Sequence, residues 1–185
     1  MGVTDLLKPV IERYLNGTVH FGRVAVKPGK PTTFATCPTM QGDGSVIDKP
    51  LFALPGNPAS ALVTFYLFVI PALRQMGGYA ERDCHLPRVR VQVRMTARFF
   101  TELHTDMTQV NDAMPLDPRT EFHRVMIRAS QDGLRAHSTG GQRSSRVPSL
   151  SGSNGFVILP QKKDDGPTQL RAGEFAEAVL IGEIQ

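Results

Sequence analysis

The sequence predicts an α/β domain over residues 1–80 followed by a mostly-β domain over residues 81–185. In the first part, segments with helical spacing of apolar residues alternate with strand-like segments, the pattern of a sheet covered by helices. In the second part, short alternating segments follow one another between turn residues, as in a small β-barrel or sandwich. The chain has 185 residues, 41% of them hydrophobic, which suffices for one sizeable core or two small ones.

The first elements are a helix and two strands. Apolar residues recur at helical spacing over residues 4–15 and predict a short amphipathic helix that ends at Asn16-Gly17. Residues 18–36 alternate apolar and polar side chains, break at the turn Lys27–Pro31 and then resume. This pattern predicts a strand, a turn and a second strand.

The most apolar stretch of the chain begins as a strand and ends as a helix. After a polar loop from Gln41 to Lys49, residues 51–54 predict a buried strand. A tight turn follows, and then a helix from about Ala59 to Met76. Gly77-Gly78 marks a change of composition, so we expect the domain boundary between residues 77 and 87.

The second part reads as strands separated by turns, without a convincing helix. Residues 101–118 show little periodicity and predict a long loop. The strand candidates are residues 88–100, 121–130, 133–140, 154–161 and 174–184.

Neither a membrane span nor a secretion signal is visible in the composition. No run of eighteen or more uncharged apolar residues occurs, and the N-terminus carries acids and bases in place of an apolar signal segment. We therefore expect no membrane insertion and a cytoplasmic location. Cys37 and Cys84 lie far apart without a CxxC motif or a histidine cluster, which predicts reduced thiols and no zinc site.

The net charge of +4 comes from 21 basic and 17 acidic residues that are scattered along the chain. No nucleic-acid-binding motif accompanies this charge, so we expect no nucleic-acid partner. A few lysines and arginines that converge on a small anion would explain the excess equally well.

Residues Pro55, Gly56, Asn57, Pro58 and Ser60 form the junction between the apolar strand and the helix. A helix that begins directly after a strand presents unpaired N–H groups at its N-terminus, where anions are favoured. Gly56 allows close approach to the backbone, Asn57 is a capping residue and Ser60 adds a hydroxyl. The alternative is an ordinary capped turn, because the motif lacks the Gly-Lys-Ser ending of a P-loop.

Four further features carry charged or polar side chains that could take part in chemistry. Lys27 and Lys30 lie on a proline-stiffened turn, where they suit an oxyanion or simply form a solvated basic hairpin. The stretch 138–149 gathers hydroxyl, amide and guanidinium groups that suit an oxyanion or a polar surface loop. His123 lacks an Asp and a nucleophile at a recognisable spacing, so we expect it to be structural. Asp5 would by default compensate the dipole of the first helix.

Five motifs in this order resemble the molybdopterin molybdenumtransferase family, which includes the bacterial MoeA enzyme, the plant molybdenum-insertase E domain and the gephyrin E domain. The resemblance covers nearly the whole chain apart from residues 99–114. The motifs are "HFGRVAVKPGKPTTFAT", "FALPGNPASALVTFYLFVIPALRQM", "LDPRTEFHR", "STGGQRSSRVPSLSGSNGFVILP" and "LRAGEFAEAVLIGEI".

The resemblance implies a fold and a reaction. It implies part of a molybdopterin-binding α/β domain followed by a small C-terminal β-barrel-like domain. It also implies insertion of molybdate into adenylylated molybdopterin with release of AMP, assisted by Mg²⁺, in a homodimer. Molybdopterin-AMP and molybdate are then the substrates, and the sequence does not distinguish molybdenum from tungsten.

The resemblance also assigns residues to roles. Lys27 and Lys30 match catalytic lysines at the molybdate end of the site, and residues Pro55 to Ser60 match a turn at the pterin cleft. Asp5 matches an acid near the divalent metal and the adenylate. The residues that match or neighbour molybdate ligands are Arg124, Ser144, Ser145, Arg146 and Ser149.

The sequence also departs from the family. The family's phosphate-binding "TSGGVS" and "TGDE"-type loops lie before the point that matches Met1, and Gly141 replaces a common histidine. We therefore expect activity to need a partner that supplies the missing groups. The alternatives are a gephyrin-like non-catalytic scaffold or receptor-binding module, and a fragment with no activity of its own.

Overall fold

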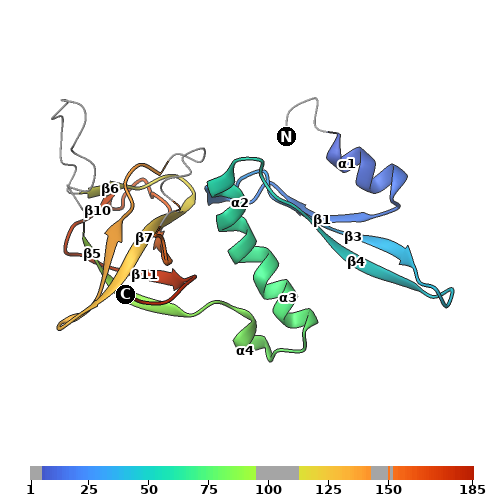
Figure 1. The fold of residues 1–185 in the computed structure, drawn as a ribbon. Helices are drawn as coiled ribbons and strands as arrows, with labels where there is room; N and C mark the ends of the chain where they lie inside the picture. The colour runs from blue at the N-terminus through green and yellow to red at the C-terminus, as the bar shows by residue number, and fades with distance from the viewer. Residues whose placement is uncertain (1–5, 95–112, 143–149, 151) are drawn as a thin grey trace, which may run out of the picture.

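The computed structural model describes residues 6–94, 113–142, 150 and 152–185. These residues form a three-stranded, a two-stranded and a six-stranded sheet. A long helix lies between an extended arm, which holds the three-stranded sheet, and a β-barrel (Figure 1). The prediction of an α/β part followed by a mostly-β, barrel-like part is therefore confirmed.

The arm contains the predicted first helix and an antiparallel sheet. The helix begins at Leu7 as α1 (Leu7–Pro9) and continues as the π-helical turn η1 (Val10–Tyr14). Strands β1 (Thr18–Gly22), β3 (Thr33–Met40) and β4 (Val46–Ala53) follow in the spatial order β1-β3-β4.

The predicted polar loop from Gln41 to Lys49 is wrong in its second half. Strand β4 begins at Val46, opposite Met40, and pairs with β3 along its whole length. The Gln41 N–H donates to the Ser45 carbonyl over 2.7 Å and closes the hairpin. Residues 46–50 are exposed, so backbone pairing and not burial makes them a strand, and no apolar alternation reveals it.

Strand β2 (Val26–Lys27) is the second departure from the prediction. The sequence predicted one strand up to residue 26, the turn Lys27–Pro31, and a second strand that pairs with the first. Instead the chain turns away at Arg23, whose φ is 65°, and β2 pairs in parallel with β7 of the barrel. Lys27 thereby moves from the arm to the edge of the barrel.

The predicted long helix is confirmed and begins at Pro58, one residue earlier than expected. It consists of α2 (Pro58–Thr64), η2 (Phe65–Val69) and α3 (Ile70–Met76). Among the described residues it is the one helix that is long and apolar enough to cross a membrane, a test that core helices also pass. The ring centroid of Phe68 lies 5.7 Å from that of Phe21 in the arm, and Val63 packs against the barrel. The helix therefore contacts both units.

The barrel is reached through the short helix α4 (Glu81–Cys84), which the sequence did not predict. Within the described residues, the ring β7-β8-β5-β11-β9 closes because β7 also pairs with β9. All five predicted strands are present, with the bounds β5 (Arg88–Arg94), β7 (Thr120–Ser130), β8 (Gly133–Ser138), β9 (Gly155–Leu159) and β11 (Phe175–Leu180).

Two further short strands form a separate two-stranded sheet. β6 (Ala113–Pro115) pairs with β10 (Gln169–Arg171). The sequence predicted a loop over residues 101–118. Within the described part of this range, residues 113–115 form strand β6, so the prediction is wrong there. A three-residue strand is too short to show an alternation.

Two apolar clusters hold the structure together. The first fills the barrel and includes Val91, Val125 and Ala136, all fully buried. The second joins the helix to the outside of the barrel, where Val63 meets Phe122, Phe156 and Val179. This second cluster fixes the position of the helix, and with it the turn at Lys27, relative to strand β7.

Candidate oxyanion-binding site

Lys27 lies where the arm meets the barrel. Its partner in the register of β2 and β7 is Glu121. The Lys27 Nζ atom lies 2.9 Å from Glu121 Oε2 and 3.2 Å from Asp117 Oδ2. The Lys27 side chain keeps 37% of its surface exposed, whereas that of Glu121 keeps 7%. The ammonium group therefore bonds two carboxylates, and the Lys27 side chain stays partly exposed.

The turn after Lys27 is shaped by glycine. Gly29 has a φ of +125°, and a side chain there would collide with Thr64 of α2. Thr32 donates to the Gly29 carbonyl from its hydroxyl over 2.7 Å and from its N–H over 3.0 Å. The turn is thus packed on the helix, and Lys30 at its tip is exposed.

Asp117 and Arg119 form a forked ion pair beside Lys27. Arg119 Nε lies 2.9 Å from Asp117 Oδ1, and Arg119 Nη2 lies 3.2 Å from Asp117 Oδ2. The hydrogen bond from Arg119 and the nearby Lys27 charge hold the pKa of Asp117 well below its ordinary value, although burial opposes them. Asp117 therefore stays ionised at neutral pH.

The pKa values of Lys27 and Glu121 move in opposite directions. Burial raises the pKa of Glu121, but hydrogen bonds from His123 and Lys27 outweigh it, and the net pKa is lowered. Burial lowers the pKa of Lys27, but the Glu121 and Asp117 carboxylates outweigh it, and the net pKa is raised. Both groups are therefore charged at neutral pH.

We expect the ion pairs of Asp117 and Glu121 to make the stability of the fold depend on pH in the acid range. The carboxylates of Asp117 and Glu121 have lowered pKa values in the folded state, so their contribution is present above the unfolded pKa of about 4 and is lost as the pH falls through the folded values. Asp117→Asn should remove about 1–2 kcal/mol at pH 7 and flatten the fall of stability below about pH 4.

Thermal unfolding between pH 7 and pH 2 measures this difference. Asp165→Asn, at an exposed turn, is the control and should follow the parent protein at each pH. If the stabilities of Asp117→Asn and the parent protein fall in parallel as the pH is lowered to 2, the ion pairs of Asp117 with Lys27 and Arg119 are contradicted.

The sequence predicted a structural role for His123, and the structure places its ring between two polar side chains. Its Nδ1 atom lies 3.6 Å from Glu121 Oε1, and its Nε2 atom lies 2.8 Å from Ser138 Oγ. The residue is buried on strand β7, with 7% of its surface exposed. The missed signal was the spacing of 121 and 123, which places two side chains on one face of a strand. Ser138 comes from β8, which no local spacing reveals.

Arg124 is fully buried on the same strand. The Arg124 N–H donates to Gln142 Oε1 over 2.8 Å. The Arg124 carbonyl accepts from the Thr139 hydroxyl over 3.0 Å and from Gln142 Nε2 over 3.3 Å. Burial lowers the pKa of the guanidinium, and the Glu121 charge partly offsets this, so Arg124 remains a cation. The turn that begins at Ser138 is thus fastened to Arg124.

The turn at Pro55–Ser60 matches its prediction only in part. Pro58 occupies the first helical turn as expected, but Asn57 makes no side-chain cap bond to the helix. Gly56, Asn57 and Pro58 are exposed, whereas Ser60 is buried at 4% exposure. Ser60 therefore faces the packed side of the helix, and its carbonyl accepts the Thr64 hydroxyl over 2.9 Å.

The remaining predicted site residues lie outside the described residues. They are Asp5, Ser144, Ser145, Arg146 and Ser149. Across the described ranges, no three His, Cys, Asp or Glu side chains are placed to hold a metal ion. The carboxylates of Asp117 and Glu121 already bond Lys27, so the described side chains do not fit a magnesium site.

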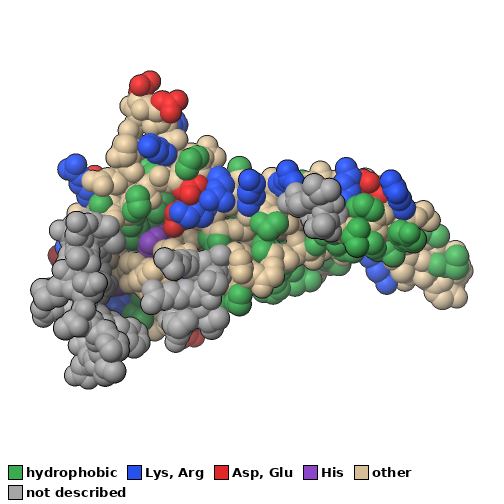
Figure 2. Space-filling model, turned by 90° about the horizontal axis from the view of Figure 1, so that it is seen from above, with side chains coloured by type: hydrophobic (Ala, Val, Ile, Leu, Met, Phe, Trp, Pro, Cys, Tyr) green, Lys and Arg blue, Asp and Glu red, His purple; other side chains and the backbone are tan. Residues whose placement is uncertain are grey.

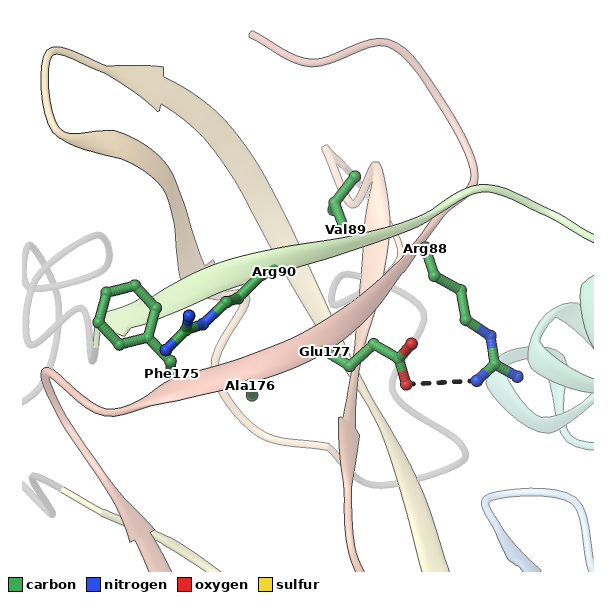
Figure 3. Close-up of a pocket in the computed structure, with 6 residues that line it drawn as sticks. All are labelled: Arg88, Val89, Arg90, Phe175, Ala176 and Glu177. Atoms are coloured by element: carbon green, nitrogen blue, oxygen red, sulfur yellow. Dashed lines mark hydrogen bonds and ion pairs between the residues drawn. The ribbon is translucent and has the colours of Figure 1, made fainter.

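The surface around this site is mixed in charge, and the two described pockets lie elsewhere. Figure 2 shows acidic and basic side chains side by side near the middle of one face, with basic side chains continuing in a row toward the arm. One pocket, of about 430 Å³, is formed by β5 and β11 (Figure 3). There Arg88 bonds Glu177 at 3.2 Å and Arg90 lies 4.4 Å above the Phe175 ring, so both guanidinium groups are already engaged.

Two protein-family models match the chain. Residues 1–75 match the family model described as a probable molybdopterin binding domain, and residues 109–181 match the MoeA C-terminal region, domain IV. The chain belongs to the molybdopterin molybdenumtransferase family. Lys27 lies in the first matched region, residues 1–75, and Glu121 and Arg124 lie in the second, residues 109–181.

Several relatives of this family resemble the chain over most of its length. Gephyrin of Dictyostelium discoideum is 39% identical over 100% of the chain and 24% of its own length. The molybdenum cofactor synthesis protein cinnamon of Drosophila melanogaster is 37% identical over 98% of the chain and 26% of its own length. A molybdopterin molybdenumtransferase of Nostoc is 35% identical over 79% of the chain and 28% of its own length. The chain thus spans about a quarter of these relatives.

A solved structure shares the fold. The molybdopterin biosynthesis MoeA protein of Pyrococcus horikoshii superposes with a TM-score of 0.56 at 22% identity, over 91% of this chain and 33% of the archaeal one. Relatives of the family are named for molybdenum cofactor synthesis, which is the process that the family serves. The exact domain boundary and the roles of the site residues stay predictions.

Proposed function

We propose that this chain supplies the molybdate-holding part of a molybdopterin molybdenumtransferase, which inserts molybdate into adenylylated molybdopterin and releases AMP. The observation that carries the proposal is the 2.9 Å contact between Lys27 of the first matched region and Glu121 of the second. Through it, the basic turn at Lys27 lies beside the strand that carries Arg124.

The charges at this junction suit such a reaction. Molybdate and the phosphates of an adenylylated pterin repel one another, and preorganised cations reduce that repulsion. Lys27 is held by two carboxylates and stays partly exposed, and Lys30 at the exposed tip of the turn adds a second ammonium group. Lysine binds tetrahedral oxyanions as a point charge, without demanding a planar partner.

Equilibrium dialysis of the chain against molybdate, with metal analysis by mass spectrometry, tests the proposal. We expect one molybdate per chain and competition by tungstate, which has the same charge and shape. Adding molybdopterin-AMP together with a longer relative should then give molybdenum-loaded pterin and AMP.

The scaffold alternative gives a different result. A non-catalytic scaffold needs no oxyanion site, so it predicts a folded chain that binds no molybdate at millimolar concentration. That result would overturn the proposed function, and a folded spectrum from circular dichroism would exclude a trivial failure.

A further inference from the structure

We propose that the outer face of strands β5, β8 and β7 is a docking surface for an extended, acidic segment of another protein. The surface, called the arginine face below, is formed by Arg94, Arg128, Arg135 and His137. It shares no residue with the oxyanion site at Lys27 and goes beyond the proposed function, so either inference can fail without the other.

The strand pattern places these four side chains together on the outside of the barrel. The residues next to them in sequence fill the barrel, so the four side chains point outward. In the sheet, the outward positions form two rows that cross the three strands. The first row holds Gln92, Arg135 and Arg128, and the second row holds Arg94, His137 and Met126. The rows lie two residues, or about 7 Å, apart along each strand.

The positive charge of the arginine face is poorly compensated within the chain. Arg135 pairs with Asp132 at 3.0 Å, but the Asp132 side chain keeps 82% of its surface exposed. Arg94 donates to the Gln92 side-chain oxygen over 3.0 Å, which is a neutral acceptor. Within the part of the chain that the structure describes, Arg94 and Arg128 make no ion pair, and Arg128 is exposed. Two of the three guanidinium groups therefore lack a carboxylate.

The surplus charge acts on His137 in the second row. Burial and the charges of the three arginines lower the pKa of His137, and no described carboxylate opposes them. Arg128 also lies directly opposite Arg135, and like charges across an antiparallel pair repel. Both side chains point outward, so the packing of the barrel does not require this pairing. A partner that brings carboxylates to this face would offset the repulsion.

An acidic protein segment matches the arginine face in chemistry and in spacing. Guanidinium groups bind carboxylates through forked hydrogen bonds, as Arg119 and Asp117 do in this chain. In an extended segment, alternate side chains point the same way and lie about 7 Å apart, which is the distance between the two rows. Acidic side chains at alternate positions can therefore meet Arg94 in one row and Arg128 in the other.

Nucleic acid and lipid surfaces match this face less well. Single-stranded nucleic acid binds where bases stack on open aromatic rings. Phe175, the partner of Gln92 on β11, has its ring covered by the Arg90 guanidinium at 4.4 Å (Figure 3). Lipid surfaces are bound where exposed apolar side chains accompany the cations, and the apolar Met126 is half-buried.

Fluorescence anisotropy with a labelled peptide of four Glu-Ser repeats tests the inference. At about 50 mM salt, we expect the chain to bind this peptide at least about tenfold more tightly than a peptide of four Gln-Ser repeats. A strand of twelve thymidine nucleotides and vesicles that contain phosphatidylserine are the alternative probes. Tighter binding of either one than of the Glu-Ser peptide would overturn the assignment to an acidic protein segment.

Variants locate the binding surface. Arg128→Gln should weaken binding of the Glu-Ser peptide by about fivefold to twentyfold, and Arg94→Gln combined with Arg128→Gln should weaken it further. Arg13→Gln is the matched control, because it removes the same charge from an exposed position on the arm. Its peptide affinity should stay within about twofold of the parent value. Equal losses in Arg128→Gln and Arg13→Gln would overturn the inference.

Stability distinguishes a docking surface from a structural role. Arg128→Gln relieves the repulsion with Arg135, so its melting temperature should equal that of the parent or exceed it by up to about 3 °C. A lower melting temperature would show that Arg128 serves the fold, and it would contradict the inference. The test uses no molybdate, so its failure leaves the proposed function standing, and a failure to bind molybdate leaves the docking surface standing.

Discussion

Lys27→Ala is expected to lower the affinity of the chain for molybdate by about tenfold to a hundredfold. The substitution removes the ammonium group that lies 2.9 Å from Glu121 and 3.2 Å from Asp117. Two carboxylates then remain without this counter-charge at the point where the anion should bind. The site thus loses an attraction and gains a repulsion, which explains the large effect.

Lys49→Ala is the matched control, because it removes the same charge from an exposed position on β4 of the arm. Its molybdate affinity should stay within about twofold of the parent value, because an exposed charge distant from the site is screened by salt. Lys27→Arg should retain more affinity than Lys27→Ala, since it keeps the charge. Equal losses in Lys27→Ala and Lys49→Ala would show that only the overall charge matters.

Phe156→Ala should destabilise the chain by about 3–5 kcal/mol. Phe156 is fully buried between the helix and the barrel, and its ring lies 6.1 Å from that of Tyr66 in an edge-to-face arrangement. Truncation leaves a cavity in the cluster that fixes the helix on strand β7. We therefore expect molybdate affinity to fall together with stability.

Urea unfolding followed by circular dichroism measures this effect. Phe175→Ala is the control, because Phe175 is 54% exposed on β11 and its ring stacks with the Arg90 guanidinium (Figure 3). It should cost less than about 1 kcal/mol. A Phe156→Ala variant as stable as Phe175→Ala would contradict the described packing of helix on barrel.

Local patterns predicted most of the fold. The helix of residues 58–76 and the five barrel strands each carry enough periodicity to be recognised within one segment. What the sequence missed depends on pairing between distant segments. The β2 pairing with β7 joins residues that lie far apart in sequence, and the exposed start of β4 is held by its hairpin partner β3.

The candidate site was predictable at the level of residue types and not of partners. The sequence singled out Lys27 and Arg124, but neither Asp117 nor Glu121, which determine how Lys27 is held. It treated Ser60 as a ligand group, and the sequence did not reveal that Ser60 is buried at 4% exposure. It also did not reveal Ser138 as a partner of His123, because Ser138 approaches through the β7–β8 pairing.

The central claim, that the two matched regions form one oxyanion site, is tested most directly by crystals of the chain soaked in molybdate. Anomalous diffraction at the molybdenum absorption edge locates the metal without reference to the protein atoms. We predict one anomalous peak, at a position from which a molybdate oxygen can accept a hydrogen bond from Lys27 Nζ. A molybdenum peak only at Arg88 and Arg90 on the other side of the barrel, or no peak at saturating molybdate, would contradict the account.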